Sequence, residues 1–319
     1  MIKFNIILLL CMLGTAWAGN PPRVLSLAPA LTETICYLGG SKYLTGRCSA
    51  CDYPAGIKTL PVAGKFGMPE IEKIVALKPD WVIGNSFANA SAVKKLRQLG
   101  IETTLAQIST PEDYIAWLKI IGKKLNLQAQ AKAAEQAFRN DEKFLQTLEP
   151  LNLKVLWVVN AKPLIVCGKG SLPDSVLKMV KVENAAGSVD KEYFRCSAEW
   201  LSTAKIDMII WSVPGTPAKN GGFLKKIPAV KNNKVIHLAM DDPICRPGPR
   251  FMQSVKALRK KLEGAAWGRE KKLFRKGSFS SVPTCPAIAF GGGGTPSLFS
   301  KPFLCIYLFA LQKDKCLKG

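Results

Sequence analysis

The sequence predicts an α/β protein with two lobes, each built on a doubly wound parallel sheet, and one long α-helix that joins them. Strand and helix patterns alternate in residues 19–110 and again in 151–267, and this alternation is typical of parallel sheets. Residues 111–150 lack strand patterns and are helical in character. With 319 residues, 48% of them hydrophobic, the chain is long and apolar enough to form two domains with substantial cores.

The first lobe, residues 19–110, begins with RVLSLAPALTETICYLGG, which predicts a strand, a turn at Ala28-Pro29 and a helix that ends at Gly39-Gly40. A short strand over 44–47 and the turn CDYP follow, and Pro69 suits the first turn of the next helix. The lobe continues with DWVIGN as a buried strand, SAVKKLRQLG as a helix and IETTLAQ as another strand.

The connector, residues 111–150, contains TPEDYIAWLKIIGKKLN and then QAQAKAAEQAFRNDEKFLQTLE, and both segments have helical patterns. The second segment is rich in Ala, Gln, Glu and Lys, with apolar residues such as Phe138 and Leu145 on one stripe. A helix of that length reaches roughly 30 Å, because each residue adds about 1.5 Å. Such a helix is long enough to bridge two lobes.

The alternation resumes after Pro150 and defines the second lobe, residues 151–267. Its predicted elements are the strand LKVLWVVN, the helices SLPDSVLKMVK and AEWLSTAK, the strands IDMIIW and NKVIHLA, and the final amphipathic helix PRFMQSVKALRKKLEG.

The two ends of the chain carry different signals. Lys3, the apolar run IILLLCML and the small residues Ala16 and Ala18 form the pattern of a signal peptide over residues 1–18. The apolar run is too short to span a bilayer, which takes about 20 residues. We therefore predict export with cleavage near Ala18. Residues 268–319 contain a Lys/Arg cluster, a glycine run and scattered Pro and Ser, so this tail is predicted to be disordered or atypical.

The formal net charge of +22 is compatible with a nucleic-acid partner or an anionic ligand. The lysines are scattered over helices, as in KKLRQLG and KALRKKLEG, and no stripe of basic and aromatic residues accompanies them. Solvated helix faces explain most of this charge. We therefore predict no nucleic-acid partner.

Export permits disulfides but does not identify the pairs. The chain has 10 cysteines, and loss of Cys11 with the signal peptide leaves an odd number, so at least one thiol is expected to be free. Cys48 and Cys51 have the CxxC spacing of redox and metal sites. Zinc is poorly supported, because the chain has no second such pair and only 1 histidine. A local disulfide and two unrelated thiols both stay open.

One helix-to-strand unit occurs twice in the chain. It appears as IEKIVALKPDWVIG, residues 71–84, and as AEWLSTAKIDMIIW, residues 198–211. Each copy has a glutamate near the helix start, Glu72 or Glu199, and an aspartate just before a short apolar strand. The helix dipole favours a glutamate in the first turn by about 0.3–1 kcal/mol. That effect explains a glutamate in each copy but does not require the repeat.

These motifs, taken in order, carry a family resemblance. RVLSLAPALTE, CDYP, GKFGMPEIEKIVALKPDWVI and the ending RPGPR at 246–250 resemble periplasmic binding proteins that feed ABC importers. The resemblance covers about residues 22–266 and is to the class joined by one long helix, which handles cobalamin and ferric siderophores. It implies two Rossmann-like lobes of the helical-backbone metal-receptor type, a periplasmic location and a monomer without a cofactor. SLAPALTE, DYP and the ending are most similar to the cobalamin-binding branch.

The resemblance gives the repeated glutamates a role. In such proteins each lobe presents one surface glutamate, and the pair docks onto arginines of the membrane-spanning permease dimer. Glu72 and Glu199 fall on those two positions. A two-lobed protein that meets a two-fold transporter needs one anionic anchor per lobe, and Arg–carboxylate pairs give directional contacts.

The resemblance also implies a ligand between the lobes, outside the carboxyl ends of the strands. A corrinoid is broad and largely apolar with amide edges, so aromatic walls with a few polar groups suit it. The candidate ligand-binding residues are Tyr53, Phe66, Tyr193, Trp211, Asp242 and Arg246. Lys65-Phe66 stands where the cobalamin branch often has a tryptophan, so a ferric siderophore or haem is the alternative ligand.

A secreted α/β enzyme or a thiol oxidoreductase is the alternative of another class. The single histidine, His237, lies in the strand pattern NKVIHLAM, which is more typical of a packed residue than of a base. The sequence has no GxSxG elbow, no HExxH and no Walker A loop. We therefore predict a binding protein with no catalytic residues and no metal site, and the CxxC pair alone keeps the oxidoreductase open.

Overall fold

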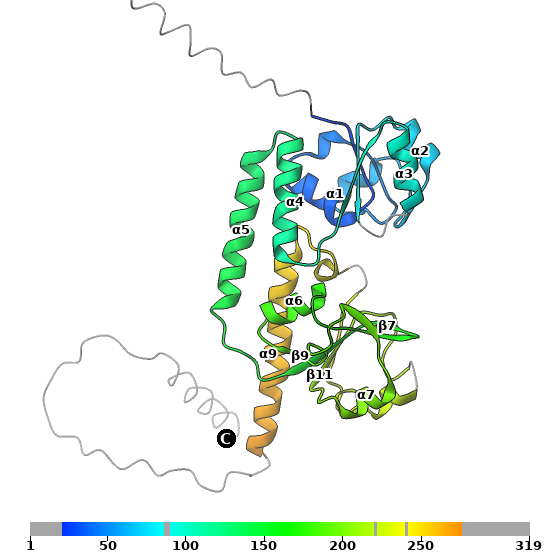
Figure 1. The fold of residues 1–319 in the computed structure, drawn as a ribbon. Coiled ribbons are helices and arrows are strands. Elements are labelled where there is room, and N and C mark those ends of the chain that lie inside the picture. Colours follow the sequence, from blue (N-terminus) through cyan, green and yellow to red (C-terminus); the bar gives the residue numbers. More distant parts are fainter. Residues whose placement is uncertain (1–20, 86–89, 220–221, 240–241, 276–319) are drawn as a thin grey trace, which may run out of the picture. The chain divides into compact units, whose positions relative to one another are not determined.

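The computed structural model describes residues 21–85, 90–219, 222–239 and 242–275 (Figure 1). The predicted signal peptide, residues 1–18, lies outside the described residues, as do residues 276–319 of the predicted tail. Among the helices in the described ranges, none combines the length and apolar composition that crossing a bilayer requires.

The first sheet is parallel throughout, with the strand order β2-β1-β5-β6. Its strands are β1 (Val24–Ser26), β2 (Leu44–Arg47), β5 (Trp81–Asn85) and β6 (Glu102–Ala106). Figure 1 shows α1 (Pro29–Tyr37) on one face of this sheet, and α2 (Ile71–Ala76) and α3 (Ala90–Gln98) on the other. β1 is interior and all three of its residues are buried. The predicted doubly wound parallel arrangement of this half is confirmed.

A short hairpin, β3 (Gly64–Lys65) and β4 (Met68–Pro69), carries Phe66 at its tip. Gly64 and Gly67 have φ values of 120° and 75°, which glycine adopts without strain. A Cβ at Gly64 would lie 2.6 Å from the carbonyl oxygen of Met68. The glycines of GKFG are therefore required by the backbone, and the tight turn leaves the Phe66 ring 45% exposed.

The connector contains α4 (Pro111–Lys124) and α5 (Gln128–Gln146), which pack side by side (Figure 1). Asn126 lies in the break between them with a φ of 56°, a left-handed conformation that asparagine tolerates better than most residues. The helices approach closely at Gly122, where a Cβ would lie 2.6 Å from the Cβ of Ala131. The longer helix, α5, has 19 residues and spans about 28 Å.

The second sheet has the strand order β10-β8-β7-β11-β12, and β9 also pairs with β7. Its strands are β7 (Lys154–Ala161), β8 (Leu164–Cys167), β9 (Glu183–Asn184), β10 (Tyr193–Arg195), β11 (Met208–Trp211) and β12 (Val235–His237). The pairs that β7 makes with β9 and β11, and β11 with β12, are parallel as predicted.

Strands β8 and β10 correct the prediction of a wholly parallel second sheet, because both pair antiparallel. Lys162 and Pro163 form a two-residue turn between β7 and β8, and Ala161 pairs directly with Leu164. A parallel neighbour would need a crossover of a dozen or more residues, which this turn does not provide. The reversal brings Tyr193, the first residue of β10, opposite Cys167 at the end of β8.

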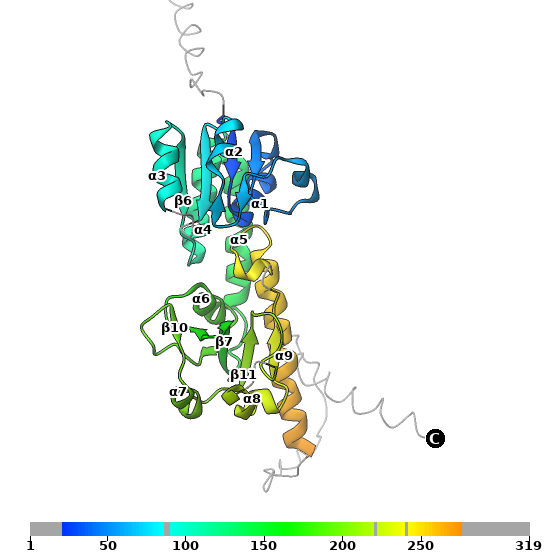
Figure 2. The ribbon, with the colours of Figure 1, turned by 90° about the vertical axis from the view of Figure 1, so that its right-hand side faces the viewer.

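The helices of the second half are α6 (Leu172–Met179), α7 (Ala198–Thr203), α8 (Pro228–Lys231) and α9 (Phe251–Arg275). Short 3-10 turns are η2 (Ser41–Tyr43), η3 (Ala55–Thr59), η4 (Gly222–Lys226) and η5 (Pro243–Cys245). Figure 2 shows α9 running along the second sheet. Phe251, Val255, Leu258 and Leu262 form its buried ridge. The helix continues to Arg275, beyond the predicted end of the lobe at residue 267.

One hydrophobic cluster includes residues of both sheets and of the helices beside them. It contains Trp81 of β5, Phe138 of α5, Trp157 of β7 and Phe251 of α9. The rings of Phe138 and Phe251 are stacked, with centroids 6.3 Å apart and an interplanar angle of 9°. α5 and α9, far apart in the sequence, are thus joined by aromatic contact.

The repeated unit has the same structure in both halves. Glu72 is the second residue of α2 and Glu199 the second residue of α7. The Asp80 carboxylate accepts the backbone N–H of Arg23 at 2.8 Å, and the Asp207 carboxylate accepts that of Lys154 at 2.9 Å. Each aspartate therefore fastens the start of its own strand to the neighbouring parallel strand.

Candidate functional site

A cavity of about 670 Å³ lies at the carboxyl ends of the parallel strands. The lining residues from Ala28 to Ser109 form the first wall and include the last residues of β5 and β6. Those from Leu172 to Pro247 form the second wall and come from the second half of the chain. The lining residues are Ala28, Pro29, Ala30, Leu31, Ala50, Phe66, Asn85, Ala106, Gln107, Ile108, Ser109, Leu172, Glu192, Tyr193, Cys245, Arg246 and Pro247. Open α/β sheets place ligand sites at this edge, and the volume is typical of a ligand pocket.

Three of the six predicted ligand-binding residues line this cavity: Phe66, Tyr193 and Arg246. Phe66 comes from the β3–β4 hairpin and Tyr193 from the start of β10, and the two side chains are 45% and 46% exposed. Arg246 follows η5 directly. The structure thus brings two accessible aromatic rings, one from each half, and one cation to the same cavity.

The other three predicted residues lie elsewhere. Tyr53 has its ring under the guanidinium carbon of Arg250, 4.0 Å from the ring centroid. The Asp242 carboxylate caps η5 by accepting the Ile244 N–H at 3.0 Å. Trp211 is 0% exposed within the core of the second sheet and does not line the cavity. Its strand is buried along its whole length, so its ring packs inside the lobe.

Sequence patterns did not identify several lining residues, most clearly the start of α1 and residues 106–109, at the end of β6 and just after it. The signal that identifies them is their position immediately after a predicted strand. The helix α1 begins with Ala28 as its N-cap and has no side-chain cap. Because the first backbone N–H groups of a helix have no partner within the helix, this end of α1 gives the cavity wall a partial positive charge.

The phenol of Tyr193 is neutral at physiological pH. Burial is the main cause that raises its pKa to about 12, and Cys167, Glu192 and Cys245 add to the shift. A neutral phenol can both donate and accept a hydrogen bond. Beside it the cavity offers Glu192 and Arg246 as charged groups of opposite sign.

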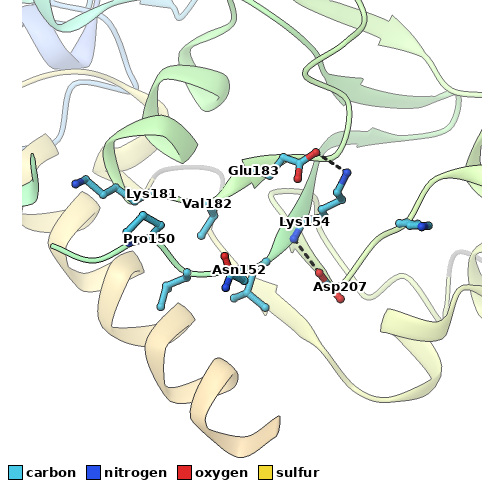
Figure 3. A pocket seen from close by; sticks show the side chains of 10 residues that line it. Pro150, Asn152, Lys154, Lys181, Val182, Glu183 and Asp207 are labelled. Atoms are coloured by element: carbon cyan, nitrogen blue, oxygen red, sulfur yellow. Dashed lines mark hydrogen bonds and ion pairs between the residues drawn. The ribbon is translucent and has the colours of Figure 1, made fainter. Parts of the chain in front are cut away.

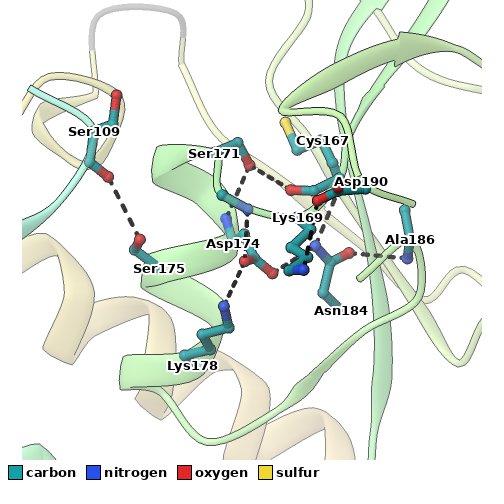
Figure 4. A network of polar contacts seen from close by, with 12 residues as sticks. Ser109, Cys167, Lys169, Ser171, Asp174, Ser175, Lys178, Asn184, Ala186 and Asp190 are labelled. Carbon is teal, nitrogen blue, oxygen red and sulfur yellow. Dashed lines mark hydrogen bonds and ion pairs between the residues drawn. The ribbon is translucent and has the colours of Figure 1, made fainter. Parts of the chain in front are cut away.

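A buried polar network lies around Asp174 of α6 (Figure 4), the helix whose first residue, Leu172, lines the cavity. The Asp174 carboxylate accepts bonds from Lys178 Nζ at 2.7 Å, Asn184 Nδ2 at 2.9 Å and Gly170 N at 3.1 Å. Burial disfavours the charged form, but these bonds together outweigh it and hold the pKa of Asp174 below its ordinary value.

The same helix connects the two walls of the cavity. Ser175 of α6 donates through its hydroxyl to the carbonyl oxygen of Ser109 at 3.4 Å (Figure 4). Ser171 caps the helix by accepting the Asp174 N–H at 3.2 Å. Because Ser109 and Leu172 both line the cavity, α6 fixes wall segments from both halves of the chain.

Cys48 and Cys51 lie beneath the first wall, with their sulfur atoms 3.1 Å apart and both side chains 0% exposed. The hydrogen bond with Cys51 lowers the pKa of the Cys48 thiol below its ordinary value. A protein substrate has no access to this pair in the folded chain, so the arrangement does not favour a thiol oxidoreductase. Within the described ranges, no group of three or more His, Cys, Asp or Glu side chains is arranged to hold a metal ion.

The two repeated glutamates are exposed. The Glu72 side chain is 85% exposed, with Lys95 Nζ 4.0 Å away as a weak counter-ion. Glu199 is also on the surface, and bonds from its own backbone N–H and from Ser197 lower the pKa of its carboxyl. Both carboxylates are therefore available to a partner.

A second cavity, of about 590 Å³, lies at the opposite ends of the second sheet's parallel strands (Figure 3). Lys154 and Glu183 form an ion pair of 2.5 Å in its wall, and Asp207 accepts the Lys154 N–H. These groups hold the starts of β7, β9 and β11 together. Lys154, Glu183 and Asp207 are engaged in strand contacts, and the first cavity lies at the carboxyl ends of the strands, so the first cavity is the better ligand site.

Comparison with known proteins places the chain in a family. The model of a family described as periplasmic binding protein matches residues 24–241. The vitamin B12-binding protein of Vibrio parahaemolyticus is 26% identical over 238 residues, which cover 73% of this chain and 86% of that protein. An uncharacterized ABC transporter substrate-binding lipoprotein of Bacillus subtilis, YvrC, is 25% identical over 253 residues, covering 75% and 79%.

Solved structures share the fold. The periplasmic vitamin B12 binding protein BtuF of Vibrio cholerae superposes with a TM-score of 0.65 at 24% identity, covering 77% of this chain and 99% of that one. The periplasmic heme binding protein HutB of Vibrio cholerae gives 0.66 at 22% identity, covering 75% and 98%. The predicted fold class is confirmed by these likenesses, which span nearly the whole of each solved chain.

Proposed function

Because this chain belongs to the periplasmic binding protein family, we propose that it captures a corrinoid, with cobalamin as the candidate, and delivers it to the permease of an ABC importer. The proposal includes export with cleavage near Ala18, a monomeric mature protein, and two lobes, residues 19–110 and 151–267, around the connector 111–150. Members of this family bind substrates for transport, so binding rather than catalysis is the activity of the cavity.

The observation that carries the ligand class is the cavity of about 670 Å³ with Phe66 from the first half and Tyr193 from the second. A corrin ring is broad and largely apolar, and it offers amides at its edge. Aromatic walls suit the ring, while the neutral Tyr193 phenol, Gln107 and Asn85 can exchange hydrogen bonds with the amides. The vitamin B12-binding relative of Vibrio parahaemolyticus supports the same choice.

Haem is the second candidate ligand. Its ring is also flat and broad, and its carboxylates suit Arg246 and the uncapped start of α1. A ferric siderophore is the third candidate ligand, and the positive net charge of the chain favours such an anionic chelate. Among these, the aromatic walls with amide-compatible polar groups favour the corrinoid.

Delivery is proposed to use Glu72 and Glu199 as anchors on the permease dimer. Each occupies the second position of a short helix in one copy of the repeated unit, and each side chain is exposed. One carboxylate per lobe fits a two-fold partner that presents one arginine on each subunit.

A competition experiment tests the ligand assignment. The purified mature protein is titrated with cyanocobalamin, haemin and a ferric hydroxamate, following intrinsic tryptophan fluorescence with correction for ligand absorbance. Saturable quenching by one cyanocobalamin per protein supports a corrinoid receptor, provided that neither haemin nor the ferric hydroxamate reverses it at similar concentration. Tighter binding of haemin or the hydroxamate would move the assignment to that ligand and leave the family membership intact.

A further inference from the structure

The turn Cys48–Cys51 brings two thiols into contact. The Cys51 N–H donates to the Cys48 carbonyl oxygen at 3.1 Å and closes the turn, and the sulfur atoms are 3.1 Å apart. A disulfide has a sulfur–sulfur distance of about 2.05 Å and joins residues whose Cα atoms lie about 4.4–6.8 Å apart, a separation that a four-residue turn provides. The pair can therefore be bridged with a side-chain movement of about 1 Å.

The surroundings hold both cysteines in this geometry. The Arg47 guanidinium donates through Nη1 to the carbonyl oxygens of Cys48 at 3.3 Å and Cys51 at 3.0 Å. The Thr32 hydroxyl, in the first turns of α1, lies 3.1 Å from Cys51 Sγ. These contacts fix the turn from both sides and leave the two sulfur atoms facing each other.

The turn also supports the cavity wall. Ala50, between the two cysteines, lines the cavity, and Ser49 donates its N–H to the Gly64 carbonyl oxygen at 2.9 Å. Gly64 opens the hairpin that presents Phe66 to the cavity. A constraint on the turn therefore acts on two separate parts of the first wall.

We propose that Cys48 and Cys51 are a modification site, oxidised during export to a disulfide that fixes this part of the cavity wall. The oxidant is another disulfide, carried by a thiol–disulfide oxidoreductase. One cysteine thiolate attacks a sulfur of that disulfide and displaces a thiolate, and the second cysteine then attacks the mixed disulfide and displaces the other. The protein loses two protons and two electrons, and the oxidant becomes a dithiol. Because both cysteines are 0% exposed once folded, the exchange precedes burial of the turn.

Peptide mapping tests the proposal directly. Trypsin cleavage after Arg47 and Lys58 releases CSACDYPAGIK, which contains both cysteines and no other. The exported mature protein is purified without reductant, acid-quenched, and alkylated with iodoacetamide after denaturation. The expected peptide carries no alkyl group and is two hydrogens lighter than the dithiol form, and prior reduction with dithiothreitol gives two alkyl groups. Two alkyl groups, or a cysteine bridged elsewhere, without reduction would overturn the proposal.

Hydrogen exchange tests the effect on the wall. In the oxidised wild type, amides of residues 48–51 are expected to exchange severalfold more slowly than after reduction. The Cys48→Ser/Cys51→Ser variant is expected to show the reduced rate with or without dithiothreitol. Cys36→Ser, which removes a half-buried thiol of α1, is the matched control and keeps the wild-type response. Equal exchange in the oxidised and reduced wild type would refute the role in the wall. The inference rests on the export that the proposed function includes, but neither experiment requires ligand, so both are independent of the ligand assignment.

Discussion

Arg250 binds Glu33 through two hydrogen bonds, Nε to Oε2 at 2.9 Å and Nη2 to Oε1 at 2.7 Å, although 217 positions separate them. Glu33 belongs to α1, and Arg250 directly precedes α9. The Glu33 side chain is 5% exposed, and its bonds to the guanidinium raise the pKa of Arg250 further above its ordinary value. This pair joins the beginning of the fold to the segment that carries Arg246 into the cavity.

Replacement of Arg250 is expected to destabilise the protein strongly. Arg250→Met leaves the buried Glu33 carboxylate without its partner, and loss of one member of such a pair costs about 3–5 kcal/mol. Urea unfolding measures this cost. Arg250→Met combined with Glu33→Gln should recover part of it, because the unpaired charge is removed.

The exposed pair Lys169–Asp190 provides the control for this prediction. Its side chains are 60% and 89% exposed, so Lys169→Met should change the free energy of unfolding by less than about 1 kcal/mol. Equal effects of the two single replacements would show that burial of Glu33 is not the cause.

The network around Asp174 predicts a specific loss of stability in acid. The folded-state pKa of Asp174 lies below its value in the unfolded chain, which is about 3.9. The charged carboxylate therefore contributes stability that is complete above that unfolded value and declines as the pH falls through the folded one. Asp174→Asn should be less stable than wild type at pH 7, by about 1–3 kcal/mol, and should lose less stability than wild type in acid.

Thermal unfolding between pH 3 and pH 7 separates this behaviour from a general charge effect. Asp190→Asn removes one carboxylate whose side chain is 89% exposed and serves as the control. If Asp174→Asn and wild type respond to acid in parallel, the Asp174 carboxylate does not carry the predicted dependence.

The end of the chain is expected to be dispensable beyond the buried ridge of α9. A chain that ends after Trp267 retains Phe251, Val255, Leu258 and Leu262, all of which are buried. Its melting temperature should stay within about 2 °C of the full chain. A chain that ends after Lys261 loses Leu262, which is 0% exposed, and should lose about 2–5 kcal/mol. Failure of the longer truncation to fold would give the tail a structural role.

The repeated glutamates predict a defect in delivery without a defect in binding. Glu72→Ala and Glu199→Ala should leave ligand affinity near wild type and lower uptake through the partner importer by about tenfold each, because a charge-assisted bond contributes roughly 1.5–3 kcal/mol. Uptake of labelled cobalamin measures this. Glu149→Ala removes an exposed glutamate outside the repeat and should have no effect. Wild-type uptake by the double variant would refute docking through this pair.

The parts of the fold that the sequence predicts well are those with local causes. Buried strands such as DWVIGN and the repeated unit with Glu72 and Glu199 follow from composition and spacing, and the structure has the same helix and strand in both copies. The break at Asn126 and the reversal at Lys162-Pro163 depend on single backbone conformations that periodicity does not record.

The site was predicted less completely, because its geometry depends on contacts between distant segments. Tyr53 is 46% exposed, as Tyr193 is, but its ring packs against Arg250, far along the chain, and does not line the cavity. Trp211 ends a strand that is buried on both faces, and an apolar strand pattern does not separate an inner wall from a core. Phe66 reaches the cavity from the tip of the β3–β4 hairpin, and Tyr193 reaches it from the start of β10.

The central claim is that the cavity between Phe66 and Tyr193 holds a corrinoid, and a cyanocobalamin titration of matched variants tests it most directly. The wild-type mature chain should bind one equivalent with sub-micromolar affinity, and Phe66→Ala and Tyr193→Ala should each weaken binding by about tenfold or more, because each loses roughly 1.5–3 kcal/mol of apolar burial. Tyr37→Ala, which removes a 58% exposed ring of α1 outside the cavity, and Trp211→Phe in the core should bind as wild type. No saturable binding by the wild type, or equal affinity in all variants, would contradict the claim.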